Sequence, residues 1–145
     1  MIKLFAKNKD DVSKAAIDFF SFGHIIGGYF AFIVSDALFL AIFGEFLIPL
    51  CIFTIFLCGT FWEIIENTIF YKKNIKFGYR RDSLVNSVMD VIMFTSGGII
   101  AAVCFELNPN TFLITTAFYY IINVLLMSIY AHLIIGLFRN IIKKK

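Results

Sequence analysis

The distribution of Lys and Arg along the chain constrains its fold more than any other feature. Four long apolar runs divide the 145 residues, and all 13 Lys and Arg residues lie before the first run, between the second and third, or after the fourth. They are Lys3, Lys7, Lys9, Lys14, Lys72, Lys73, Lys76, Arg80, Arg81, Arg139 and Lys143 to Lys145. Because the cytoplasmic flanks of membrane helices collect Lys and Arg, this pattern predicts a multi-pass cell-membrane protein with both termini in the cytoplasm.

The apolar runs predict an all-α membrane bundle of four transmembrane helices, in one domain over residues 19–138. The expected spans are residues 19–43, 46–70, 83–105 and 111–138. Each exceeds the roughly 20 residues that cross about 30 Å of hydrocarbon. Residues 139–145 would form a basic cytoplasmic tail. Residues 1–18 would form a short interfacial amphipathic helix, since Val12, Ala15 and Ala16 recur at helical spacing opposite Asp11 and Lys14.

Composition supports the membrane assignment. Hydrophobic residues make up 60% of the chain, whereas soluble domains hold about 45–50%. The formal net charge of +3 is confined to one side, which predicts membrane lipids with anionic headgroups as partners. Nucleic acid is not expected as a partner, because the basic residues form no patch interleaved with aromatic residues.

Polar side chains interrupt the apolar runs, and ionisable groups inside a span are expensive enough to mark a function. These residues are His24, Asp36, Glu63, Glu66, Asn67, Asn86, Asp90, Asn123 and His132, with Asp82 just before the third span. At 1.5 Å per residue, one ionisable group in each span lies about 9–12 Å from its cytoplasmic end. The sequence therefore predicts one polar cluster in the cytoplasmic half of the bilayer.

Helical spacing selects the members of this cluster. Asp82, Asn86 and Asp90 are four residues apart and share one face. We expect the cluster to contain His24, Glu63, Glu66, Asn86 and Asp90. The membership of His132 stays open, because it and Asn123 point to opposite sides of the fourth span. The membership of Asp36, which lies in the outer half, stays open as well.

Two kinds of chemistry suit these side chains. A divalent metal ion could bind Glu63, Glu66 and Asp90, with His24 favouring manganese, iron or zinc. Alternatively, His24, Glu63 and Asp90 could be catalytic groups that move protons. In either case Arg80 and Arg81, together with Asp82 and Asn86, would bind an anionic substrate.

Glycines mark the expected helix contacts. Gly23 and Gly27 form a Gly-x-x-x-Gly motif, and Gly97 and Gly98 notch the third span. Such notches let helix backbones approach closely in lipid. A homo-oligomer formed through Gly23 and Gly27 is one expected use of this motif.

Three motifs carry a resemblance to known proteins. They are Ser21-Phe-Gly-His-Ile-Ile-Gly-Gly28, Trp62-Glu-Ile-Ile-Glu-Asn67 and Asp82-Ser-Leu-Val-Asn-Ser-Val-Met-Asp90. In order and spacing they resemble a group of small uncharacterised prokaryotic membrane proteins and, more distantly, the VanZ-like family. The resemblance implies a shared site, without a defined reaction, built from His24, Glu63 with Glu66, Arg80 or Arg81, and Asp82 with Asn86.

These features together indicate a membrane protein that binds or modifies a lipid headgroup or another amphiphilic anion, with or without a metal. The sequence does not decide whether the protein is an enzyme. Two alternatives stay open. The polar cluster could lock the helices of a non-catalytic scaffold, or it could be part of a small proton- or cation-coupled transporter.

Overall fold

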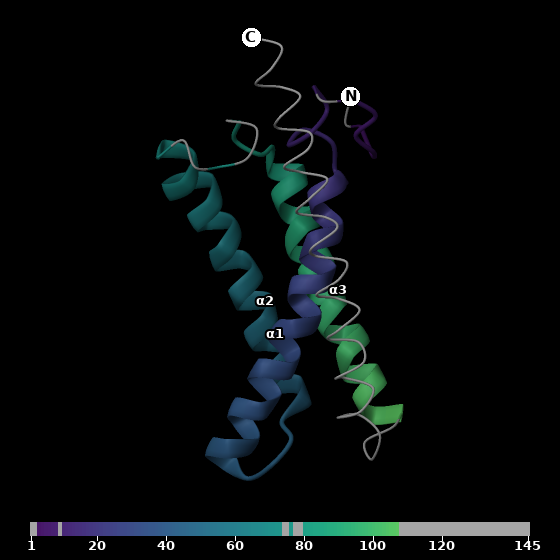
Figure 1. The fold of residues 1–145 in the computed structure, drawn as a ribbon, viewed down its shortest axis with the longest axis vertical. Helices are drawn as coiled ribbons and strands as arrows, with labels where there is room; N and C mark the ends of the chain where they lie inside the picture. Colours follow the sequence, from purple (N-terminus) through teal and green to yellow (C-terminus); the bar gives the residue numbers. More distant parts are fainter. Residues whose placement is uncertain (1–2, 9, 74–75, 77–79, 108–145) are drawn as a thin grey trace, which may run out of the picture. The chain divides into compact units, whose positions relative to one another are not determined.

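Three apolar helices form the part of the chain that the computed structural model describes, residues 3–8, 10–73, 76 and 80–107 (Figure 1). They are α1 (Phe19–Phe43), α2 (Ile48–Ile65) and α3 (Leu84–Leu107), and a π-helical turn, η1 (Glu66–Phe70), continues α2. With η1 included in the second span, the spans are 25, 23 and 24 residues long, and each is long and apolar enough to cross a membrane. The protein is therefore all-helical in this region and has the helices of a multi-pass membrane protein.

The first three predicted spans coincide with these helices to within a few residues. The fourth predicted span, residues 111–138, and the basic tail, residues 139–145, lie outside the described residues. The chain divides into two compact units, Met1–Cys104 and Phe105–Lys145. The candidate site and the helix contacts around it lie in the first unit.

The helices place apolar side chains outside and polar side chains inside. Val34 and Phe61 are 67% and 61% exposed, whereas Glu63, Asn86 and Asp90 are only 5%, 1% and 3% exposed. A soluble protein of this size rarely exposes so continuous an apolar surface. Contact with lipid tails suits the exposed apolar side chains, whereas the side chains of Glu63, Asn86 and Asp90 are shielded within the bundle.

Local sequence sets the ends of α1. The Asp18 carboxylate accepts hydrogen bonds from the backbone N–H groups of Phe20 and Ser21, at 2.8 and 3.3 Å, and Ser21 Oγ accepts one from the Asp18 N–H at 3.2 Å. This reciprocal pair is a capping box, which satisfies N–H groups that a helix start leaves free. Gly44 ends α1 with a φ of 74°, a left-handed conformation that glycine adopts without strain.

Glycines bring α1 and α3 into backbone contact. A Cβ atom added to Gly28 would lie 1.7 Å from the Phe94 carbonyl oxygen, and one added to Gly97 would lie 1.9 Å from the Ile25 carbonyl oxygen. The Phe94 ring fills a second notch, because Cβ atoms on Gly27 and Gly59 would lie 3.0 and 3.1 Å from it. Gly27 thus packs within the chain, and oligomerisation through Gly23 and Gly27 stays a prediction.

The N-terminal segment does not form the predicted interfacial helix in its described residues. It runs as turns and bends, closed by an isolated bridge between Phe5 and Ile17. Polar side chains bind the backbone and compete with helix formation. Asn8 Oδ1 accepts from the N–H of Asp10 at 3.1 Å, and Asp18 Oδ2 accepts from the N–H of Ser13 at 3.0 Å.

The N-terminal segment is held by an ion pair within itself and by hydrogen bonds to the start of α3. Lys3 Nζ lies 2.5 Å from Asp11 Oδ1, and its hydrogen bond to that carboxylate is the main cause of the lowered pKa of Asp11. The Ser83 N–H donates to the Ser13 carbonyl at 2.7 Å, and Ser83 Oγ donates to the Lys14 carbonyl at 3.2 Å. The segment therefore lies beside the end of α3 from which the polar cluster is built.

Candidate metal centre

Three side chains from three helices meet at one end of the bundle. His24 of α1 places Nε2 3.7 Å from Glu63 Oε1 of α2 and 3.8 Å from Asp90 Oδ2 of α3. The side chains of His24, Glu63 and Asp90 are only 14%, 6% and 5% exposed. One nitrogen or oxygen atom from each lies within 4.8 Å of the other two. The structure therefore brings these three side chains together, as the sequence predicts.

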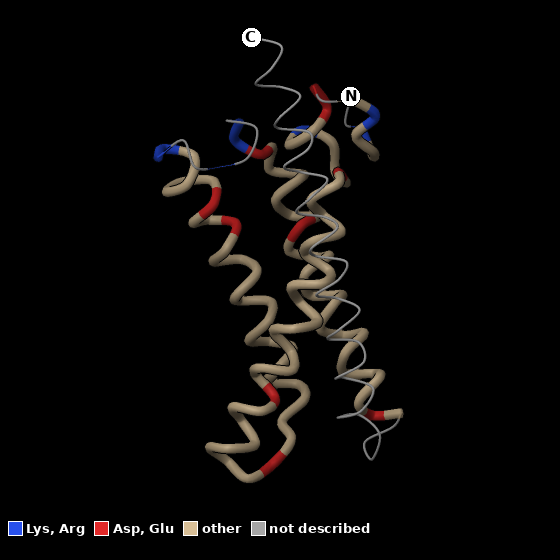
Figure 2. Tube along the Cα trace, in the orientation of Figure 1, with Lys and Arg blue, Asp and Glu red and all other residues tan. Residues whose placement is uncertain are grey.

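The cluster lies near the end of the bundle that carries the basic residues. Among the described residues, Lys and Arg gather where α1 begins, η1 ends and α3 begins (Figure 2). His24 lies six residues after Asp18, which is about 9 Å along the helix axis. The cluster is therefore set about two helical turns inside the basic end.

Three buried polar atoms around the cluster have no hydrogen-bond partner among the described residues. They are Glu63 Oε1, Asp90 Oδ1 and Asn86 Nδ2. A buried polar group without a partner costs about 1–3 kcal/mol, and more when it is charged. Most buried polar groups in native proteins are paired, so each exception needs an explanation. A bound ligand that contacts both carboxylates and accepts a hydrogen bond from Asn86 would remove all three exceptions.

Asn67, in the π-helical turn η1, holds the Glu63 carboxylate in place. Its Nδ2 lies 3.1 Å from Glu63 Oε2, from the Glu63 carbonyl oxygen and from Ser87 Oγ. Glu63 Oε2 is thereby occupied, and Oε1 is left to face His24. Single π turns within α-helices are rare and occur frequently at functional sites. Here the turn places an amide directly behind one candidate ligand.

Lys76 enters this region as a buried cation. Its side chain is 3% exposed, and Nζ lies 3.4 Å from Glu66 Oε1 and 2.9 Å from Asn67 Oδ1. Lys76 also forms an ion pair with Asp82. In the sequence, Lys76 is one of five cations between the second and third apolar runs. The signal that could have singled it out is the pair of carboxylates, Glu66 and Asp82, that flank the loop and require a positive partner.

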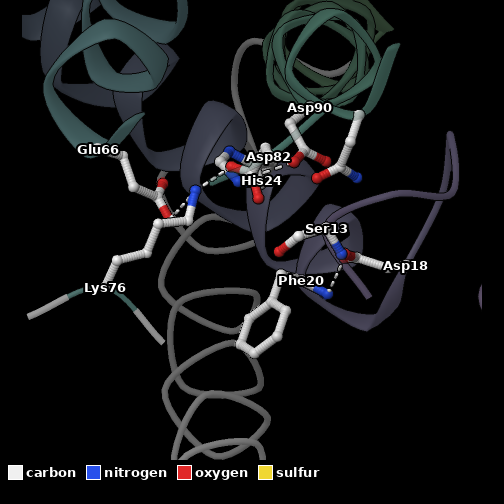
Figure 3. Close-up of a pocket in the computed structure, with 9 residues that line it drawn as sticks. Ser13, Asp18, Phe20, His24, Glu66, Lys76, Asp82 and Asp90 are labelled. Atoms are coloured by element: carbon white, nitrogen blue, oxygen red, sulfur yellow. Dashed lines mark hydrogen bonds and ion pairs between the residues drawn. The ribbon is translucent and has the colours of Figure 1, made fainter. Parts of the chain in front are cut away.

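A small cavity adjoins the cluster. Its volume is about 50 Å³, and a buried water needs about 10–15 Å³, so it has room for about three waters. It is lined by Ser13, Asp18, Phe20, His24, Glu66, Lys76, Asp82, Asn86 and Asp90, most of which Figure 3 labels. Four carboxylates, one ammonium and one imidazole face this space. Such an excess of carboxylate suits a cation.

The comparison of the whole sequence with known families gives one result. The model of a family described as a protein of unknown function, DUF2585, matches residues 1–140. The chain belongs to the DUF2585 family. No curated protein sequence and no solved structure matches it. The resemblance to the VanZ-like family stays a prediction.

Two predicted anion-binding residues of this DUF2585 protein lie outside the lining of the cavity. Arg80 forms an ion pair with Asp10 at 3.2 Å, in which the two side chains are 46% and 83% exposed. Arg81 is exposed. Asp82 and Asn86, the other two predicted anion-binding residues, do line the cavity. Among the described residues, the Lys or Arg side chain that lines the cavity is Lys76.

The remaining predicted residues are distributed as follows. Glu66 lines the cavity but is directed to Lys76, and it is not among the three side chains that could hold one ion. Asp36 is buried and lies 4.0 Å from Cys51 Sγ, outside the lining of this cavity. His132 lies outside the described residues. Of the four predicted metal ligands, the structure thus brings together His24, Glu63 and Asp90.

Proposed function

We propose that this DUF2585 protein is a multi-pass cell-membrane protein that binds a divalent metal ion at His24, Glu63 and Asp90. The ion binds the headgroup of a lipid or of another amphiphile that enters from the cytoplasmic leaflet. The observation that carries the proposal is the convergence of three buried ligand groups from three helices, two of which have unpartnered carboxylate oxygens.

The ligand set indicates the kind of metal. One imidazole nitrogen and two carboxylate oxygens suit first-row divalent ions such as Mn²⁺, Fe²⁺ and Zn²⁺. Ligand atoms about 2.0–2.2 Å from a tetrahedral ion lie about 3.4 Å from one another. The distances of 3.7 and 3.8 Å from His24 Nε2 to the two carboxylates are close to that value. Small side-chain movements would therefore complete the site.

The distribution of charge supports an orientation with both termini in the cytoplasm. Cytoplasmic flanks of membrane helices are rich in Lys and Arg. The connection between α1 and α2, residues 44–47, contains neither, whereas Lys72, Lys73, Lys76, Arg80 and Arg81 all lie between η1 and α3. In this orientation the metal site lies in the cytoplasmic half of the bilayer.

The position of the site supports a lipid headgroup as ligand. The cluster lies about two turns inside the basic end of the bundle, toward the side from which a lipid headgroup would enter. Deeper in the bundle, the Phe94 ring packs between Gly27 and Gly59, with its centroid 6.4 Å from that of His24. Apolar packing on the deep side favours a site that opens toward the headgroups over a transport path.

Metal analysis of the purified protein tests the proposal. After incubation with Mn²⁺, Fe²⁺ or Zn²⁺ and removal of free ion, the wild-type protein should retain about one ion per chain. Glu63→Gln and Asp90→Asn should each weaken metal binding at least about tenfold, because each removes a charged ligand. The matched control is Asp36→Asn, which alters a buried carboxylate in a different part of the bundle. No retained metal, or equal loss in the control, would contradict the proposal.

A structural role for the cluster is the second candidate function. If His24 is protonated, its contacts with Glu63 and Asp90 are ion pairs that could lock three helices together. Apolar residues of similar volume can replace a buried ion cluster without loss of stability. A His24→Leu, Glu63→Met, Asp90→Leu variant that folds and keeps the cellular phenotype would favour this scaffold function over metal binding.

A further inference from the structure

We infer that the metal-loaded site binds an oxygen of a phosphate group and that Asn86 donates a hydrogen bond to this oxygen. The inference rests on the proposed function, because the metal supplies most of the positive charge that an anion requires. It names the chemical class of the ligand and assigns a specific donor to it.

The first support is the burial of Asn86 and its lack of a partner. Asn86 is 1% exposed and lines the same cavity as His24 and Asp90. It lies one turn before Asp90 on the same face of α3. Its Nδ2 has no acceptor among the described residues. A side-chain amide carries two N–H donors, so Asn86 Nδ2 is available to an acceptor in the cavity.

The second support is that most carboxylates around the cavity already have partners. In the loaded site, Glu63 Oε1 and Asp90 Oδ2, the oxygens that lie closest to His24 Nε2, contact the metal. Glu66 and Asp82 are paired with Lys76, and Asp18 accepts hydrogen bonds at the start of α1. An oxygen of a ligand in this cavity would give Asn86 Nδ2 the acceptor that it lacks among the described residues.

The third support is the number of protein ligands. Three protein ligands leave at least one coordination position of a divalent ion open for a non-protein ligand. An oxygen bound there could accept from Asn86 at the same time. Phosphate oxygens prefer hard divalent cations and charge-assisted donors. Phosphate is also the anionic group of membrane lipid headgroups, and free phosphate offers the same oxygen.

The test uses the full chain in a neutral detergent, loaded with Mn²⁺. Dodecyl phosphate and inorganic phosphate are the two probes, and the relaxation rate of water protons reports the displacement of water from Mn²⁺. The wild-type protein should bind dodecyl phosphate. Asn86→Leu and Asn86→Asp should weaken this binding about 10- to 100-fold, because each removes a hydrogen bond to a charged group. The affinity of Asn86→Leu for Mn²⁺ should change by less than about threefold, because Asn86 is not a metal ligand.

Each outcome is decisive. Tighter binding of dodecyl phosphate than of inorganic phosphate identifies a lipid headgroup as the ligand, and equal binding identifies free phosphate. Asn86→Gln keeps a donor and should recover part of the affinity, which separates a donor role from a purely structural one. If metal-loaded wild type binds neither probe, or if Asn86→Leu binds them as tightly as wild type, the inference is wrong while metal binding stands. If the wild type does not bind Mn²⁺, both the inference and the proposed function are wrong.

Discussion

Lys76 Nζ donates a hydrogen bond of 2.9 Å to Asn67 Oδ1, and Asn67 Nδ2 donates one of 3.1 Å to Glu63 Oε2. The Asn67 amide therefore joins a buried cation of the loop to a candidate metal ligand. Its oxygen also accepts from the backbone N–H of Asp82 at 2.8 Å. A residue that hydrogen-bonds to a metal ligand in this way fixes the orientation and the basicity of that metal ligand.

Replacing Asn67 should weaken metal binding without removing a ligand. Asn67→Leu frees Glu63 Oε2 and lets the carboxylate rotate away from His24. Loss of such a supporting residue costs about 10- to 100-fold in metal affinity. Titration with Mn²⁺ measures the effect, and Thr60→Ala, which removes only a hydrogen bond within α2, is the control. Unchanged affinity in Asn67→Leu would show that the amide has no orienting role.

Replacing Lys76 should destabilise the protein. Lys76→Met leaves Glu66 and Asp82 without their cation, and loss of one partner of a buried pair costs about 3–5 kcal/mol. Thermal unfolding in detergent measures the loss of stability. The control is Lys72→Met, which replaces an exposed lysine of the same region. Adding Asp82→Asn to Lys76→Met should recover part of the loss, because it removes one uncompensated charge. Equal stability of the two lysine variants would contradict the buried ion pairs.

Adding a methyl group at the α1–α3 contact should separate these helices. Gly28→Ala and Gly97→Ala both place Cβ against a backbone carbonyl, and overpacking of this kind costs about 1–3 kcal/mol or more. Metal binding should weaken as well, because α1 carries His24 and α3 carries Asp90. Gly27→Ala meets only a side-chain ring and should cost less. The order of unfolding temperatures in the same detergent checks this prediction.

Metal binding should weaken as the pH falls. The metal binds neutral imidazole and ionised carboxylates, so protons compete for all three ligands. We expect a decrease of up to about tenfold in Mn²⁺ affinity for each pH unit over the range in which one ligand gains a proton. Titrations between about pH 8 and pH 5.5 measure the slope. An affinity that does not depend on pH would exclude His24 and the carboxylates as the metal ligands.

Cysteine labelling tests the orientation in the membrane. With Cys58 and Cys104 replaced by Ala, the Glu45→Cys variant should react with a membrane-impermeant maleimide in intact cells. The Lys73→Cys variant should react only after the cells are broken. Both positions are exposed in the structure, so burial does not explain a difference. The opposite pattern would place the basic loop, and the site beside it, on the outer side.

Spans and candidate ligands could be predicted from the sequence for different physical reasons. A span is a local property, since about 20 apolar residues suffice to define it. His24, Glu63 and Asp90 could be predicted because charged groups in lipid must face one another or a cavity. Counting residues from the cytoplasmic end of each helix then placed the three side chains at about the same depth in the bilayer.

The details that escaped prediction depend on non-local contacts or on side chains that bind the backbone. Asn67 comes four residues after Glu63, a spacing that puts both side chains on one face of a helix, but its contacts with Ser87 and Lys76 join distant parts of the chain. The five cations of the loop look equivalent in sequence, and only the packed structure selects Lys76. The N-terminal helix was predicted wrongly, because apolar spacing ignored the side chains of Asn8 and Asp18 that bind the backbone.

The position of the Phe94 ring bears on how strongly the membrane voltage affects metal binding. The ring fills the space between Gly27 and Gly59 on the deep side of His24. An ion at the proposed site would therefore enter and leave from the cytoplasmic side. It then crosses only about 9 Å of the roughly 30 Å hydrocarbon thickness. The membrane voltage is worth about 2.3 kcal/mol per charge per 100 mV over the full thickness, so it would change the binding free energy of a divalent ion at this depth by about 1.4 kcal/mol per 100 mV. This is roughly a tenfold change in affinity, so both the supply of metal on one side of the membrane and the membrane voltage would control loading.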